Sequence, residues 1–159
     1  MQHGFIKVGA AIPLVSVADT KYNTEQLIAM AHRAHEEGAE VTVFPELCIT
    51  GYTCGDLLTQ QTLLQEVENS VEEFSEATKE YDNIYIIGAP IYVCGALYNC
   101  ALVMQQGLIL GIVPKCYIPN YGEFSERRWF STGYNLRMED DIHYAGQWVH
   151  IGSYQIFHT

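Results

Sequence analysis

The first part of the chain alternates apolar and polar segments in a pattern that predicts a strand, a helix and a second strand. Residues 5–12 form an apolar run that ends at a proline, which predicts a buried strand. Asn23 and Gln26 stand in capping-box spacing, and apolar residues follow at three- and four-residue steps up to Gly38, which predicts a helix. Residues 41–44 predict the next strand. Because such a unit closes as a right-handed crossover, we expect the two strands to be parallel.

The middle of the chain predicts a second amphipathic helix. Asp56, at the end of a loop rich in glycine and threonine, stands where a helix cap is expected. The opposite face of this helix carries six glutamates, which we interpret as a solvated helix face, with a partner surface or a cation site as the alternative. The inner, apolar face comprises Leu64, Val67, Val71, Phe74 and Tyr81.

Three further strands are predicted without a helix between them, at residues 83–93, 97–105 and 108–113. A tight turn is expected at Gln106–Gly107, between the last two. Such short returns require antiparallel pairing. The predicted fold class is therefore α/β, with a mixed β-sheet and helices on one face.

A long irregular segment separates these strands from the C-terminal part. Residues 114–135 contain two prolines, two glycines and six aromatic residues. Loops of this length in a compact domain are usually functional. Weaker strand signals follow at residues 147–151 and 154–157.

Composition and charge narrow the classes of function. The 159 residues are 48% apolar and suffice for one hydrophobic core, so a single domain is expected. A net charge of −11 argues against nucleic acid and against an anionic membrane as the main partner, since both require clustered Lys and Arg. No segment is long and apolar enough to cross a bilayer. Five cysteines without a CxxC pair indicate reduced thiols, and we expect a cytoplasmic protein.

Two segments carry candidate chemistry, FPELCITGYTCGD at 44–56 and PKCYIPNYGEFSERRWF at 114–130. In each, a charged residue follows a proline at the end of an apolar strand: Glu46 in the first and Lys115 in the second. Ligands bind at strand ends in α/β sheets. A carboxylate and an ammonium that face each other at the rim of an apolar core are suited to acid–base catalysis, and a structural salt bridge between two strand ends is the alternative.

These segments resemble the nitrilase (carbon-nitrogen hydrolase) superfamily. The resemblance runs from about residue 5 to residue 130 and includes Pro45–Glu46 and Lys115 with Glu123 downstream. The string GYTCGDL at 51–57 is similar to the N-terminal glutaminase domain of glutamine-dependent NAD synthetases. The resemblance implies the αββα sandwich of that superfamily, of which residues 1–159 would form an N-terminal portion.

The resemblance also implies roles for four residues. Glu46 matches the general base that takes the proton of a cysteine nucleophile. Lys115 matches the lysine that stabilises the negative charge of the tetrahedral intermediate. Glu123 matches a second glutamate that positions this lysine and the substrate, and Tyr121 matches a glutamine-binding tyrosine. The implied reaction is hydrolysis of glutamine, whose ammonia passes to a synthetase domain that amidates nicotinic acid adenine dinucleotide to NAD.

The chain departs from the family pattern at the nucleophile. The family cysteine lies well after the lysine, and the chain has no cysteine after Cys116. Cys116 directly follows Lys115, so in an extended segment its side chain points the other way. Cys48 could share a face with Glu46 but stands at the wrong place in the family order. The remaining three, Cys54, Cys94 and Cys100, are expected to be inert buried thiols.

We therefore expect the chain alone to be inactive as a glutaminase. No cofactor and no metal are expected in this portion, because ATP and Mg²⁺ would belong to the C-terminal synthetase domain, which is absent from the chain. The expected partners are glutamine, that synthetase domain and further copies of the chain in a homo-oligomer. Two alternatives stay open: a free-standing nitrilase-type amidase, and a non-catalytic nitrilase-like module that serves in assembly.

Overall fold

The computed structural model describes residues 4–136 and 141–157 as one five-stranded mixed sheet, two long helices and a small hairpin. The sheet order is β1-β2-β3-β4-β5, with β1, β2 and β3 parallel and β4 and β5 antiparallel to their neighbours. The predicted mixed sheet, crossover and antiparallel returns are confirmed. The elements are β1 (Val8–Ala10), α1 (Thr20–Glu36), β2 (Val41–Val43), α2 (Gln61–Thr78), β3 (Ile84–Val93), β4 (Ala96–Gln105), β5 (Leu108–Pro114), β6 (Asp141–Tyr144) and β7 (Gln147–His150), with short 3₁₀ helices at Gly55–Thr59, Glu126–Arg128 and Gly133–Asn135.

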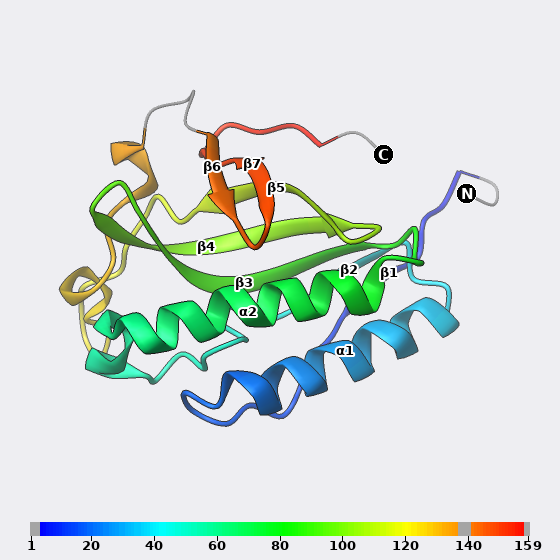
Figure 1. The fold of residues 1–159 in the computed structure, drawn as a ribbon, viewed down its shortest axis with the longest axis horizontal. Helices are drawn as coiled ribbons and strands as arrows, with labels where there is room; N and C mark the ends of the chain where they lie inside the picture. Colours follow the sequence, from blue (N-terminus) through cyan, green and yellow to red (C-terminus); the bar gives the residue numbers. More distant parts are fainter. Residues whose placement is uncertain (1–3, 137–140, 158–159) are drawn as a thin grey trace.

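Both helices and the β6–β7 hairpin cover one face of the sheet (Figure 1). Phe74 of α2 is fully buried, and its ring meets those of Phe44 and Tyr85 edge-on at centroid distances of 6.1 and 5.7 Å. The hairpin is tied to α2 because the backbone N–H of Ala145 donates to Glu68. Burial of this apolar face is the main source of stability for the fold.

The opposite face of the sheet is exposed along β1 and β2, and here one prediction is wrong. The first apolar run was expected to be a buried strand, but β1 is a three-residue edge strand whose Val8 is 65% exposed. The next strand shows the same pattern, with Thr42 buried on the helical side and Val43 exposed. Successive side chains of a strand point to opposite faces, so these apolar side chains lie on the face opposite the two helices.

Both helices begin at other residues than predicted. The Asp19 side chain, rather than Asn23, caps α1 by accepting the N–H of Tyr22. Asn23 is fully buried and joins two loops, because its amide donates to the carbonyls of Ser16 and Ile49.

Asp56 lies in the short 3₁₀ helix at Gly55–Thr59, and helix α2 begins only after Gln60. The Asp56 carboxylate instead accepts hydrogen bonds from Arg128 at 2.8 and 2.9 Å and from the indole N–H of Trp129 at 2.8 Å. Asp56 therefore anchors the long irregular segment.

The C-terminal part agrees with the prediction only in part. Strand β7 confirms the signal at 147–151, and β6 was not predicted. Residues 154–157 do not form a strand, although Gln155 donates to the carbonyl of Ile112 at the edge of β5. No described helix is long and apolar enough to span a membrane.

Candidate active site

Glu46 is held where β2 ends because the chain crosses very close to β3. A Cβ atom on Gly88 of β3 would lie 2.5 Å from the backbone nitrogen of Leu47 and 2.7 Å from the carbonyl oxygen of Pro45. Only glycine allows this approach. Directly after Glu46, Leu47 has a φ of 51°, a left-handed conformation that is unfavourable for leucine and turns the chain sharply. The position of Glu46 is thus determined by local backbone geometry.

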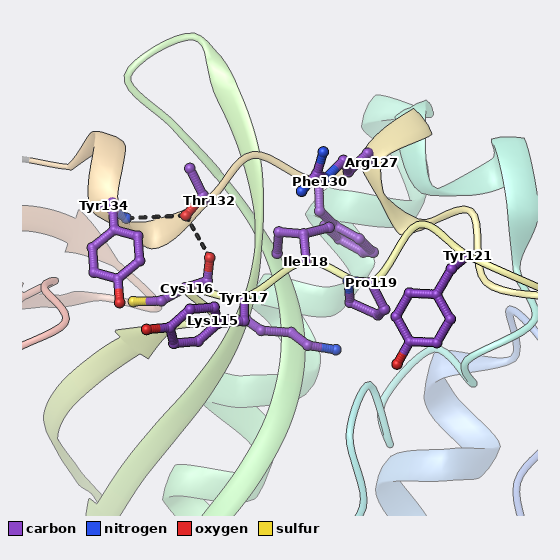
Figure 2. A pocket seen from close by; sticks show the side chains of 10 residues that line it. All are labelled: Lys115, Cys116, Tyr117, Ile118, Pro119, Tyr121, Arg127, Phe130, Thr132 and Tyr134. Carbon is purple, nitrogen blue, oxygen red and sulfur yellow. Dashed lines mark hydrogen bonds between the residues drawn. The ribbon is translucent and has the colours of Figure 1, made fainter.

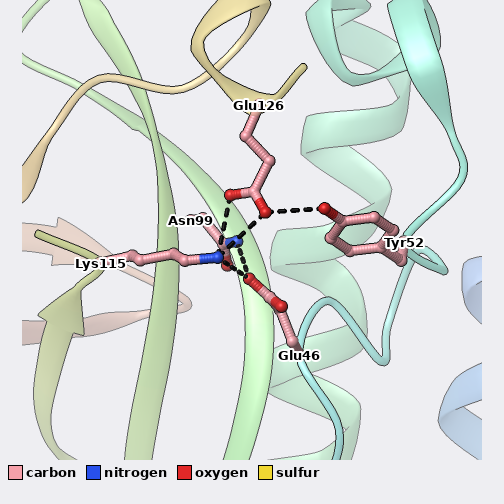
Figure 3. A network of polar contacts seen from close by, with 5 residues as sticks. All are labelled: Glu46, Tyr52, Asn99, Lys115 and Glu126. Atoms are coloured by element: carbon pink, nitrogen blue, oxygen red, sulfur yellow. Dashed lines mark hydrogen bonds and ion pairs between the residues drawn. The ribbon is translucent and has the colours of Figure 1, made fainter. Parts of the chain in front are cut away.

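Lys115 reaches the same point from the end of β5. Its backbone N–H donates to the carbonyl of Asn99 at 2.8 Å, which continues the pairing of β4 with β5. Its Nζ lies 2.7 Å from Oε1 of Glu46 (Figure 3). The structure therefore brings together the two residues that the sequence indicated as a facing pair.

The second carboxylate at Lys115 is Glu126, which the sequence analysis did not single out. Nζ lies 3.0 Å from each oxygen of Glu126, whose side chain is 4% exposed. The Tyr52 hydroxyl donates to Oε1 of Glu126 at 2.7 Å (Figure 3). Glu123 is exposed and lines a cavity beside Tyr52, and the ion pairs of Lys115 within the described residues are those with Glu46 and Glu126.

Packing explains why Glu126 is buried. It begins a 3₁₀ helix, and its carbonyl accepts the N–H of Phe130 at 2.8 Å. Phe130 and Ile118 belong to a small apolar cluster with Leu47 and Leu58. This cluster folds the irregular segment back over the end of β2.

One ammonium is thus shared by two carboxylates at the centre of the site. Burial alone would lower the pKa of Lys115, but the hydrogen bonds and charges of Glu46 and Glu126 outweigh this and raise it above its usual value. Lys115 is therefore protonated at neutral pH. Burial and the hydrogen bond to Glu126 also raise the pKa of Tyr52, so its hydroxyl acts as a donor.

A cavity of about 770 Å³ extends from Lys115 along the irregular segment (Figure 2). Tyr121 stands at one end of it, 71% exposed, with its ring 5.8 Å from that of Phe124. The hydroxyl of Thr132 donates to the carbonyl of Cys116 on the opposite wall. A small polar substrate could enter here and reach the ammonium.

No cysteine thiol of the described residues is hydrogen-bonded to the Glu46 carboxylate or the Lys115 ammonium. Cys116 points away from the Lys115 ammonium, as expected, and its Sγ lies 3.1 Å from the hydroxyl of Ser153 (Figure 2). Cys48 is buried, and its thiol is hydrogen-bonded to the backbone of Gly88. Burial raises the pKa of Cys48 to about 11, so it stays a thiol at neutral pH.

Two of the remaining three cysteines are inert buried thiols, as predicted. Burial raises the pKa of Cys54 and of Cys100. Cys94 contradicts the prediction, because it is exposed in the turn between β3 and β4 with a φ of 51°. Within residues 4–136 and 141–157, no three His, Cys, Asp or Glu side chains could together hold a metal ion.

The chain is similar to known proteins in sequence and in fold. A family model described as carbon-nitrogen hydrolase matches residues 8–149. A glutamine-dependent NAD(+) synthetase from Mycobacterium tuberculosis is 37% identical over 132 residues, which are 83% of this chain and 19% of that protein. The crystal structure of such a synthetase from Cytophaga hutchinsonii has a TM-score of 0.82 at 25% identity and covers 92% of this chain and 25% of that one.

An amidase from Nesterenkonia sp. shares the fold, with a TM-score of 0.71 at 17% identity over 93% of this chain and 55% of the amidase. The chain spans about a fifth of the length of the synthetases and about half of the amidase. Since the family model covers most of the residues, the chain belongs to the carbon-nitrogen hydrolase (nitrilase) family and is related to glutamine-dependent NAD(+) synthetases.

Proposed function

We propose that this chain carries the base and the oxyanion-stabilising lysine of a site that hydrolyses glutamine to glutamate and ammonia. The observation that supports this most directly is the Nζ of Lys115, which lies between the carboxylates of Glu46 and Glu126. Amide hydrolysis through a thioester needs a base for the thiol and a cation for the carbonyl oxygen. The identity to synthetases favours glutamine as the substrate.

The thiol would come from outside residues 1–159, because none of the five cysteines is hydrogen-bonded to the pair and burial keeps Cys48 and Cys100 as thiols. Glu46 takes the thiol proton, the sulfur attacks the amide carbon, and Lys115 stabilises the resulting oxyanion. The C–N bond then breaks, and Glu46 gives its proton to the departing ammonia. Water, deprotonated by Glu46, cleaves the thioester, and the thiol regains its proton. Among the solved relatives, the Nesterenkonia amidase carries a covalent adduct at an active-site cysteine.

Glu126 takes the role that the sequence analysis gave to Glu123, because Glu126 contacts both Lys115 and Tyr52. With Tyr52 as donor, it holds the ammonium toward the cavity. Tyr121 keeps its proposed role as a substrate contact at the exposed end of that cavity, and Glu123 lines the neighbouring one. The ammonia would pass to an ATP- and Mg²⁺-dependent synthetase half that forms NAD, so no step in this portion involves ATP or a metal.

A chimera tests this proposal. In the M. tuberculosis synthetase, the segment that aligns with residues 8–130 of this chain would be replaced by those residues. Ammonia release from glutamine would then be measured. We expect a folded, active chimera, whereas the 159-residue chain alone releases none. Glu46→Gln and Lys115→Met in the chimera should each lower kcat by about 10²- to 10³-fold.

The two glutamates provide a matched pair of variants in the same chimera. Glu126→Gln should lower kcat by about 10²-fold, and Glu123→Gln by less than about tenfold, because of these two glutamates Glu126 is the one that pairs with the ammonium. A Glu46→Gln chimera with full activity, or ammonia release by the isolated chain, would overturn the proposal.

A further inference from the structure

Asn99 contacts both members of the Glu46–Lys115 pair. It lies on β4 with only 4% of its surface exposed. Its side-chain amide donates to Oε1 of Glu46 (Figure 3). Its backbone carbonyl accepts the N–H of Lys115 at 2.8 Å. A buried carboxamide needs partners, and the acceptor for this amide N–H is the carboxylate of Glu46, a candidate catalytic group.

Asn99 also lies on a rigid element. Strand β4 is paired on both sides, with Asn99 opposite Pro90 and the next residue opposite Pro114. Glu46, by contrast, follows a short strand, and 42% of its side chain is exposed. A flexible carboxylate loses effectiveness as a base unless neighbouring groups restrict its rotamers.

Both hydrogen bonds to Glu46 end on the same oxygen. Asn99 and Nζ of Lys115 each donate to Oε1. The other oxygen, Oε2, takes neither of these bonds and is therefore the one available to accept a proton.

We propose that Asn99 is a positioning residue that fixes the Glu46 carboxylate through Oε1 and directs Oε2 to the nucleophile. The proposal rests on the proposed function for its catalytic meaning, while the contact itself can be tested in the chain as it stands. For this role, the side chain at position 99 must supply an N–H donor from a strand, and neither aspartate nor leucine has such a donor.

The first test is a pH titration of the 159-residue chain by ¹⁵N NMR. The Asn99 side-chain amide signals should shift as the Glu46 carboxylate is protonated, and this shift should vanish in Glu46→Gln. The amide of Asn69, which donates to exposed Glu66 on α2, serves as a reference that Glu46→Gln leaves unchanged. The contact is overturned if the Asn99 signals do not shift with pH, or if their shift persists in Glu46→Gln.

The second test uses the chimera. Asn99→Leu should lower kcat by about tenfold to 10²-fold, change the KM for glutamine by less than about threefold, and move the acidic limb of the pH–rate profile to higher pH. Asn83→Leu is the matched control, because Asn83 is also buried and donates to the backbone carbonyl of Ala39 away from the site. That control should lower stability but keep kcat and the pH profile. Asn99→Asp, which adds a carboxylate and keeps the shape, replaces Asn99→Leu if the latter does not fold.

The two proposals fail in different ways. Loss of activity in the unmodified chimera would contradict the proposed function and leave the NMR contact intact. An active chimera in which Asn99→Leu and Asn99→Asp keep the wild-type kcat and pH profile would refute the positioning role alone.

Discussion

Replacing Lys115 with methionine tests whether this ammonium is needed to keep Glu126 buried. Methionine is unbranched and of similar length, so the change removes the charge with little change of volume. Glu126, with 4% of its side chain exposed, would then be a buried carboxylate without its cation. We expect a clear loss of stability, because an unpaired buried charge is costly.

The size of the loss follows from the distance. Two unit charges 3.0 Å apart attract by about 5 kcal/mol at an effective dielectric constant of about 20. Since 30% of the Lys115 side chain is exposed, water screens part of this attraction. We therefore expect Lys115→Met to lower the free energy of unfolding by about 2–3 kcal/mol.

Urea unfolding followed by circular dichroism measures this loss. Adding Glu126→Gln to Lys115→Met should restore at least half of it, because the buried charge is then gone. Lys79→Met is the control, since Lys79 pairs with Glu76 on the exposed face of α2, and its effect should stay below about 0.5 kcal/mol. If Lys115→Met is as mild as Lys79→Met, the ammonium does not stabilise Glu126 and the electrostatic account of the site is refuted.

Three further predictions follow from the same contacts. Gly88→Ala should lower the free energy of unfolding by urea by about 3 kcal/mol, because its Cβ would overlap the backbone next to Glu46. In the control Gly9→Ala, the closest contact of the new Cβ is 3.3 Å, and the loss should stay within about 1 kcal/mol. At pH 8, Ellman's reagent should modify exposed Cys94 readily and Cys48, whose pKa burial raises to about 11, only on unfolding; equal rates would contradict the burial of Cys48. Because the pKa of Lys115 is raised in the folded chain, its stabilisation should be complete below about pH 10.4 and fall as pH rises through the folded pKa. The stability difference between wild type and Lys115→Met should therefore be constant from about pH 7 to 10 and shrink only above about pH 10.4.

The convergence of Glu46 and Lys115 could be predicted because it depends on strand direction. Strands β2 and β3 are parallel, and two antiparallel returns bring β5 back to the direction of β2. The carboxyl ends of β2 and β5 therefore lie at the same edge of the sheet. Apolar periodicity and short turns reveal this order in the sequence.

The contact between Glu126 and Lys115 could not be predicted in this way. Residues 114–135 have no hydrophobic period, so nothing in the pattern tells which of Glu123 and Glu126 turns inward. That choice depends on tertiary contacts, namely the apolar cluster under Phe130 and the bonds from Arg128 to Asp56. The cap of α1 was misplaced for a similar reason, because Asn23 satisfies buried carbonyls of other loops rather than the helix end.

The open sheet face limits what the candidate site can do by itself. A hollow of about 440 Å³ on this face has an apolar floor that includes Val43 and Ile86, and Glu46, Asn99 and Lys115 stand at one end of it. Oxyanion stabilisation by a lysine is strongest where water is excluded, and 30% of the Lys115 side chain is exposed. Under the proposed function, effective amide hydrolysis would require a layer that covers this face, and because no thiol of the chain is hydrogen-bonded to the pair, we expect the same layer to supply the thiol. Because Glu46, Lys115 and Asn99 line this apolar hollow, the proposed function implies that covering the face and completing the site are a single event.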